Sequence, residues 1–112
     1  MTRRYALYCL PAPGSRLEAF GRAVLGHDNV SGTPVPHPEG LGDLAPVTAG
    51  ARVYGFHATL KAPLRLAPGT GEADLVAAAR ALAAAHPPLA VGPLRVAALG
   101  PFLALVPEVP PP

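Results

Sequence analysis

Proline and glycine constrain this chain more than any other feature of its sequence. The 112 residues include 16 Pro and 12 Gly, and these punctuate most of the length. They predict short helices and strands separated by long irregular segments, because each of them tends to end a regular element. Half of the residues are hydrophobic and 14% are charged, a balance that is typical of a folded chain rather than a disordered one. A chain of this length has room for one modest core, so we expect a single domain over residues 1–112.

The hydrophobic pattern between these breaks predicts four strands and two helices. In the first helix Ser15 and Glu18 form a capping box, and Gly26 is a natural stop. The expected strands span residues 4–10, 53–64, 89–100 and 102–107, and the expected helices span 15–26 and 72–86. Gly100 and Pro101 form the expected turn between the last two strands.

Two segments show no period. Residues 27–51 form a long Pro- and Gly-rich loop, which we interpret either as a disordered surface loop or as a loop that covers a substrate. The Pro-rich tail over residues 107–112 cannot extend a sheet. The mixed order with its closing hairpin predicts an α+β fold, in which two helices cover one face of a mostly antiparallel sheet.

Composition and motifs exclude several classes of protein. The net charge of +2, without a basic cluster, argues against DNA binding and against a membrane surface. No apolar run approaches membrane-spanning length, and the N-terminal one is too short for a signal peptide, so we expect a cytoplasmic protein. Cys9 is the single cysteine, and we expect it to be buried as a small hydrophobe. No His or Cys spacing suits a metal, and the GTGEAD turn lacks the G-K-[ST] of a phosphate loop, so we expect neither metal nor cofactor.

The segment YGFHATLKAPLR, residues 54–65, carries the candidate chemistry. In a strand, alternate side chains share a face, so the even positions would pack in the core while His57, Thr59 and Lys61 line the other face. A hydroxyl donor, an ammonium and an imidazole that titrates near neutral pH together suit a phosphate group. Gly55 beside His57 would leave room for a ligand. The H-x-[ST] pattern alone is weak, and a solvated outer strand face stays open as the alternative.

RVYGFHATLKAPLRLAPG, with the opening RRYALYCLPAPGS and the later LGPFLALVP, resembles a family of proteins encoded beside bacterial phosphonate-degradation genes. That family is of unknown function and lies within the two-histidine (2H) phosphoesterase superfamily. The resemblance implies one lobe of a bilobal α+β fold. Each lobe would supply an H-x-[ST] strand to a cleft in which two histidines act on a phosphodiester without metal. It implies an acid/base role for His57 and phosphate binding by Thr59. Tyr5 or Tyr8, from the neighbouring strand, would line the cleft.

The resemblance covers only the N-terminal half of such proteins, and the second motif is missing. His27 is followed by Asp-Asn, His37 by Pro-Glu and His86 by Pro-Pro. We therefore expect a phosphodiesterase-type hydrolase, acting on a cyclic phosphate or an RNA end, that needs a second H-x-[ST] from a missing half or from another copy in a homodimer. The alternatives are a non-catalytic anion-binding or interaction module and an inactive fragment.

Overall fold

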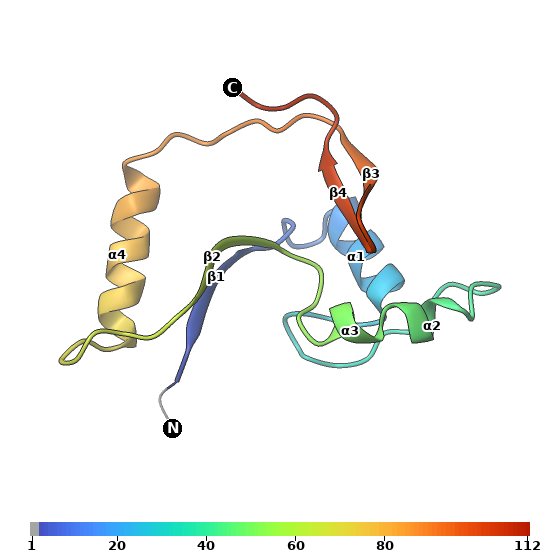
Figure 1. Ribbon diagram of the computed structural model, residues 1–112, viewed down its shortest axis with the longest axis horizontal. Coiled ribbons are helices and arrows are strands. Elements are labelled where there is room, and N and C mark those ends of the chain that lie inside the picture. The colour runs from blue at the N-terminus through green and yellow to red at the C-terminus, as the bar shows by residue number, and fades with distance from the viewer. Residues whose placement is uncertain (1–2) are drawn as a thin grey trace. The chain divides into compact units, whose positions relative to one another are not determined.

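The chain has an α+β fold in which the strands pair antiparallel, as the sequence predicts (Figure 1). The structure is a computed structural model that describes residues 3–112. Its contacts divide the chain into two compact units, one reaching to Leu66 and one spanning Ala67–Pro112, and each is described by itself. The prediction of a single domain stays a prediction. The elements are β1 (Tyr5–Cys9), α1 (Arg16–Leu25), α2 (Leu44–Val47), α3 (Ala49–Arg52), β2 (Ala58–Leu64), α4 (Glu72–Ala84), β3 (Leu94–Leu99) and β4 (Phe102–Pro107).

Helix α1 begins and ends where its capping residues predict. The Ser15 hydroxyl accepts a hydrogen bond from the Glu18 N–H at 3.1 Å, and the Glu18 carboxylate accepts one from the Gly14 N–H at 3.0 Å. Gly26 ends the helix with a φ of 70°, and its N–H donates to the Arg22 carbonyl at 2.8 Å. A left-handed residue is favourable for glycine and costly for most others, so Gly26 fixes the helix end.

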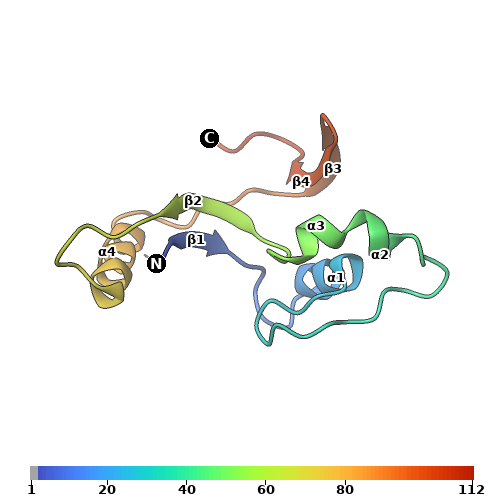
Figure 2. The ribbon, with the colours of Figure 1, turned by 60° about the horizontal axis from the view of Figure 1, so that its bottom comes forward.

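Strands β1 and β2 form the first antiparallel pair, and they lie side by side in both views (Figures 1 and 2). Tyr8 lies opposite Thr59, and Cys9 lies opposite Ala58. The ladder is irregular twice, between Tyr5 and Leu7 and again between Leu7 and Tyr8. These irregularities adjust which residue of β2 each tyrosine faces.

The expected strand over residues 53–64 starts too early. Helix α3 and a turn take up the chain as far as His57, and β2 begins only at Ala58. The expectation that even positions form a core face is wrong as well, since Leu60 is 71% exposed and Tyr54 is 64% exposed. The reason is that the three helices of this unit pack against one another and not against the strand pair. No apolar side chain among residues 3–112 is fully buried.

The segment over residues 27–51 has more structure than its composition indicates. It contains a bridge between His27 and Pro34, the short helix α2, and most of α3. Side chains bind this segment and the adjoining Arg52 to α1, because the His37 Nδ1 bonds the Ala23 carbonyl at 3.1 Å and the Arg52 Nε donates to the Leu25 carbonyl at 2.8 Å. Figure 2 shows α2 and α3 lying along α1. The segment therefore forms a helical layer on α1.

The second unit consists of α4 and the β3–β4 hairpin. The Asp74 carboxylate accepts a hydrogen bond from the Gly71 N–H at 2.8 Å, which stabilises the start of α4. The hairpin turns through Gly100 and Pro101, as predicted, and pairs Leu99 with Phe102. Gly100 has a φ of 64°, which a type II′ turn requires at its first central residue. Among residues 3–112, no helix combines the length and apolar character needed to cross a membrane.

Candidate functional site

His57, Thr59 and Tyr8 come together where β2 begins. The His57 Nε2 lies 3.1 Å from the Thr59 hydroxyl oxygen. The Tyr8 and His57 rings are stacked, with centroids 3.7 Å apart and planes 18° apart. Tyr8 reaches this position because it lies directly opposite Thr59 on β1. The histidine and the threonine therefore share one face, although His57 itself precedes the strand.

The second ring nitrogen of His57 is held by the backbone. Its Nδ1 lies 2.9 Å from the Gly55 carbonyl oxygen. A carbonyl oxygen only accepts, so Nδ1 must carry the proton in this bond. In the neutral ring, Nε2 is then the acceptor that faces the Thr59 hydroxyl. This tautomer suits a general base whose reactive nitrogen points towards an exposed side chain.

Lys61 and Tyr5, also predicted as site residues, lie on the same strand pair. Lys61 is exposed on β2, two residues beyond Thr59, and pairs with Leu7. Tyr5 pairs with Leu64 at the other end of the ladder. The structure thus separates two tyrosines that the sequence left equivalent, since it is the Tyr8 ring that stacks on His57. Cys9, expected to be buried, is exposed at the end of β1.

Gly55 is buried, and the space beside it is filled by Asn29 rather than left open for a ligand. Gly55 has a φ of 77°, and a Cβ atom built there would overlap the Asn29 side-chain amide. The Asn29 Nδ2 donates to the Phe56 carbonyl at 2.9 Å, while its Oδ1 is buried without a hydrogen-bond partner. Sequence reasoning did not find Asn29, because it lies 27 residues before Phe56 in a segment without periodicity.

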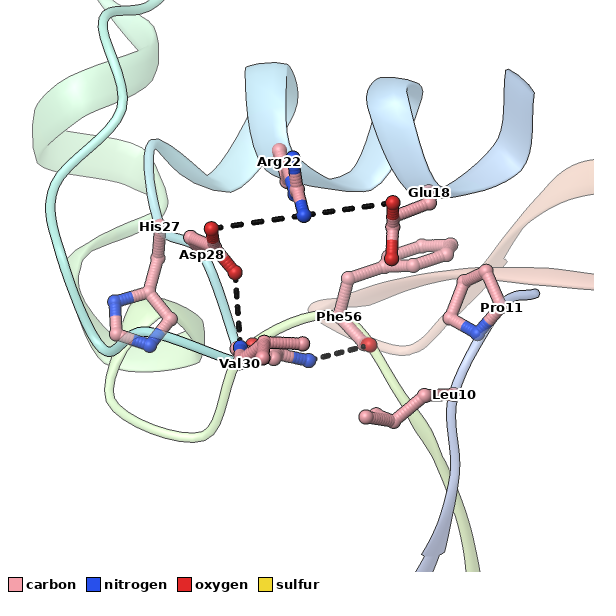
Figure 3. A pocket seen from close by; sticks show the side chains of 9 residues that line it. Leu10, Pro11, Glu18, Arg22, His27, Asp28, Val30 and Phe56 are labelled. Atoms are coloured by element: carbon pink, nitrogen blue, oxygen red, sulfur yellow. Dashed lines mark hydrogen bonds and ion pairs between the residues drawn. The ribbon is translucent and has the colours of Figure 1, made fainter. Parts of the chain in front are cut away.

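A small pocket of about 20 Å³ lies between the start of the irregular segment and α1 (Figure 3). Arg22 lies between two carboxylates in it, 3.4 Å from Glu18 and 3.5 Å from Asp28. The pKa of Asp28 is lowered, chiefly because its carboxylate accepts a hydrogen bond from the Val30 N–H at 2.9 Å, with smaller effects from Ser31 and Arg22. The pocket is lined by Leu10, Pro11, Glu18, Arg22, His27, Asp28, Asn29, Val30 and Phe56.

The pocket does not offer an anion a free cation, since both carboxylates already face Arg22. Within the part of the chain that the structure describes, no three His, Cys, Asp or Glu side chains gather closely enough to hold a metal ion. The group formed by His57, Thr59 and Tyr8 is therefore the candidate site, and Asn29 lies between it and the pocket.

Comparisons with known proteins find a matching family model and curated relatives. A family model described as "Protein of unknown function (DUF1045)" matches residues 59–112. The chain is 43% identical over 106 residues to a protein of Janthinobacterium sp. (strain Marseille) named "Ribose 1,5-bisphosphate phosphokinase PhnN". The matched region covers 91% of this chain and 23% of that protein. A protein of the same name from Laribacter hongkongensis (strain HLHK9) is 48% identical over 82 residues, or 71% of this chain and 20% of that protein.

The chain thus spans less than a quarter of the length of the curated relatives it matches. The matches support the resemblance to a phosphonate-associated family of unknown function, and the wider 2H phosphoesterase relationship stays a prediction. No solved structure matches the chain significantly.

Proposed function

We propose that this chain supplies one H-x-T half of a metal-independent phosphodiesterase site. The observation that carries the proposal is the geometry of His57, whose Nε2 faces the Thr59 hydroxyl at 3.1 Å while Nδ1 is fixed on the Gly55 carbonyl. A general base needs a defined tautomer and a reactive nitrogen within hydrogen-bond reach of the proton that it takes. The Gly55 contact supports the required tautomer, and Nε2 faces an exposed hydroxyl at the start of β2.

The proposed roles follow from the chemistry of three polar side chains, one just before β2 and two on it. His57 takes a proton from a water or hydroxyl, or returns one to the leaving oxygen. The Thr59 hydroxyl rotates away from Nε2 and donates a hydrogen bond to a phosphoryl oxygen. Lys61, exposed on the same strand, offsets the negative charge of the substrate.

One histidine cannot lie on both sides of a phosphorus atom. In-line displacement places the attacking and leaving oxygens on opposite sides, so the second acid or base must come from elsewhere. The other three histidines of this chain are not followed by an x-[ST] pair. We propose that a second H-x-[ST] is supplied by another copy in a homodimer or by a polypeptide segment outside this chain.

The proposed substrate is a cyclic phosphate of ribose or an RNA end. The relatives are named for a phosphorylated ribose, which supports a ribose phosphate as substrate class. Their kinase name does not suit the residues of this chain, because the single lysine, Lys61, follows Leu60 and no G-x-x-x-x-G-K-[ST] loop is present. The matched segment is a small part of each relative, so that activity can belong to the remainder.

The test is hydrolysis of 2′,3′-cyclic AMP and of a ribose cyclic phosphate in the presence of EDTA, over a range of protein concentrations. We expect His57→Ala to lower the rate by at least about 10²-fold, the usual contribution of a general acid or base. His86→Ala, in the second unit, is the matched control and is expected to keep the rate. A specific activity that rises with concentration would support completion by a second copy. Activity that survives His57→Ala would refute the proposal.

A second candidate function is an anion-binding module without catalysis. The exposed Thr59 and Lys61, on a strand that follows a single histidine, favour this alternative. It predicts that inorganic phosphate shifts the NMR signals of Thr59 and Lys61 in the wild type and not in a Lys61→Ala variant, with no turnover at any protein concentration. Turnover that depends on His57 would exclude it.

A further inference from the structure

We propose that Asn29 is a positioning residue that sets the tautomer and orientation of His57. The proposal concerns a contact between the irregular segment before β2 and the turn that carries the histidine. For catalysis it rests on the proposed function, whereas its effect on the imidazole can be measured without any substrate.

Asn29 fixes the backbone at two consecutive residues. Its Nδ2 donates to the Phe56 carbonyl at 2.9 Å. Its Oδ1 is packed against the Cα side of Gly55, where a Cβ atom would overlap it. The amide therefore lies against both residues that immediately precede His57.

The backbone that Asn29 contacts also bonds the His57 imidazole. The Gly55 carbonyl accepts the hydrogen bond from the His57 Nδ1 at 2.9 Å. Gly55 adopts a φ of 77°, a conformation that glycine tolerates and that needs surrounding contacts to be unique. A rotation at Gly55 would turn its carbonyl away from Nδ1, and the proton would then be free to move to Nε2. Asn29 prevents this rotation through its contacts with Gly55 and Phe56.

The environment of Asn29 indicates a cost that a merely space-filling residue would avoid. Its Oδ1 is buried without a hydrogen-bond partner, which disfavours the folded state. An apolar residue would avoid this penalty but would lose the bond to Phe56. The amide thus accepts this penalty at the position where its donor bonds the turn before His57.

The test is the protonation pattern of the His57 ring, measured by long-range ¹H–¹⁵N NMR at a pH where the ring is neutral. The wild type is expected to carry its proton on Nδ1. Asn29→Ala is expected to move a substantial share of it to Nε2, and Asn29→Asp, which keeps the shape and loses the donor, is expected to do the same. Val30→Ala is the matched control, since Val30 is the next residue and is 77% exposed. Backbone amide spectra show in each case whether the variant is folded.

A double variant tests the pathway. If Gly55 and Asn29 act through one contact, the double variant Gly55→Ala/Asn29→Ala should move less of the ring proton to Nε2 than the sum of the two single variants. An unchanged Nδ1 proton in folded Asn29→Ala and Asn29→Asp would overturn the proposal. Should Asn29→Ala not fold, the same outcome in Asn29→Asp alone would overturn it.

The catalytic consequence has its own readout. In the hydrolysis assay we expect Asn29→Ala to lower kcat about 10- to 100-fold with KM within about two-fold, as for a misplaced catalytic group. If the tautomer moves and the wild type has no hydrolase activity, the positioning role stands and the proposed function fails. If the wild type is active and neither tautomer nor kcat responds to Asn29, the positioning role fails and the proposed function stands.

Discussion

Arg52 is expected to hold the helical layer onto α1, and its removal should loosen that layer locally. The guanidinium donates to the Leu25 carbonyl at 2.8 Å, to the Ala45 carbonyl at 2.6 Å and to the Thr48 hydroxyl at 2.9 Å. Leu25 is the last residue of α1, whose terminal carbonyls have no partner within the helix. One side chain therefore joins the end of α1 to α2 and to the residue between α2 and α3.

The magnitude follows from these three bonds. A hydrogen bond from a charged donor contributes about 1.5–3 kcal/mol. Arg52 is half-buried, so water replaces part of what is lost, and we expect Arg52→Ala to lower the free energy of local opening by about 2–4 kcal/mol. At about 1.4 kcal/mol for each factor of ten, amide protection over residues 22–52 should fall about 30- to 1,000-fold.

Hydrogen exchange followed by mass spectrometry measures this protection peptide by peptide, with peptides from α4 as the internal reference. Arg52→Lys keeps the charge and loses the planar fork, so it should fall between the wild type and Arg52→Ala. The exposed Arg65 supplies the control, Arg65→Ala. Equal protection of residues 22–52 in Arg52→Ala and Arg65→Ala would show that the guanidinium does not hold the layer.

Two further predictions concern stability. Gly21→Ala should destabilise the chain by about 1–3 kcal/mol, since the new Cβ would overlap the Phe56 ring. Gly50→Ala, where a new Cβ would have no atom within 4 Å, should show the ordinary stabilising effect of alanine in a helix. Urea unfolding followed by circular dichroism compares the two variants, and a Gly21→Ala variant as stable as the wild type would contradict the predicted overlap. Because the pKa of Asp28 is lowered from 3.8 on folding, its contribution is present above pH 3.8 and is lost as pH falls through the lower folded value. The gap in urea midpoint between wild type and Asp28→Asn should therefore close on acidification below pH 3.8, with Asp43→Asn as control, and a gap that widens there would reverse the assigned sign.

Local signals in the sequence predict those elements whose limits are set by local bonds. Ser15 and Glu18 cap α1 through contacts within four residues, and Gly26 ends it. Gly100 and Pro101 turn the hairpin in the same way. In each case the chemistry that fixes the element lies inside the stretch that predicts it.

The start of β2 and the support of His57 could not be predicted, because the contacts that fix them are distant in sequence. Asn29 bonds Phe56 across 27 residues, and Arg52 bonds Leu25 across the same separation. Alternation from residue 53 therefore assigned a strand to residues 53–57, where the chain forms a turn and a bend between α3 and β2. It placed His57 and Thr59 on one side correctly, since a turn followed by the strand keeps them within hydrogen-bond distance.

The two irregularities in the β1–β2 ladder decide which chemical group meets the aromatic ring of Tyr8. From the pair Tyr5 and Leu64 to the pair Tyr8 and Thr59, β1 advances from residue 5 to 8 while β2 retreats from 64 to 59. A regular antiparallel ladder starting from the first pair would instead place Lys61 opposite Tyr8. Straightening the ladder would exchange a hydroxyl for an ammonium beside the ring without altering the composition of either strand. Backbone register, as well as residue identity, thus determines which side chains meet on this face.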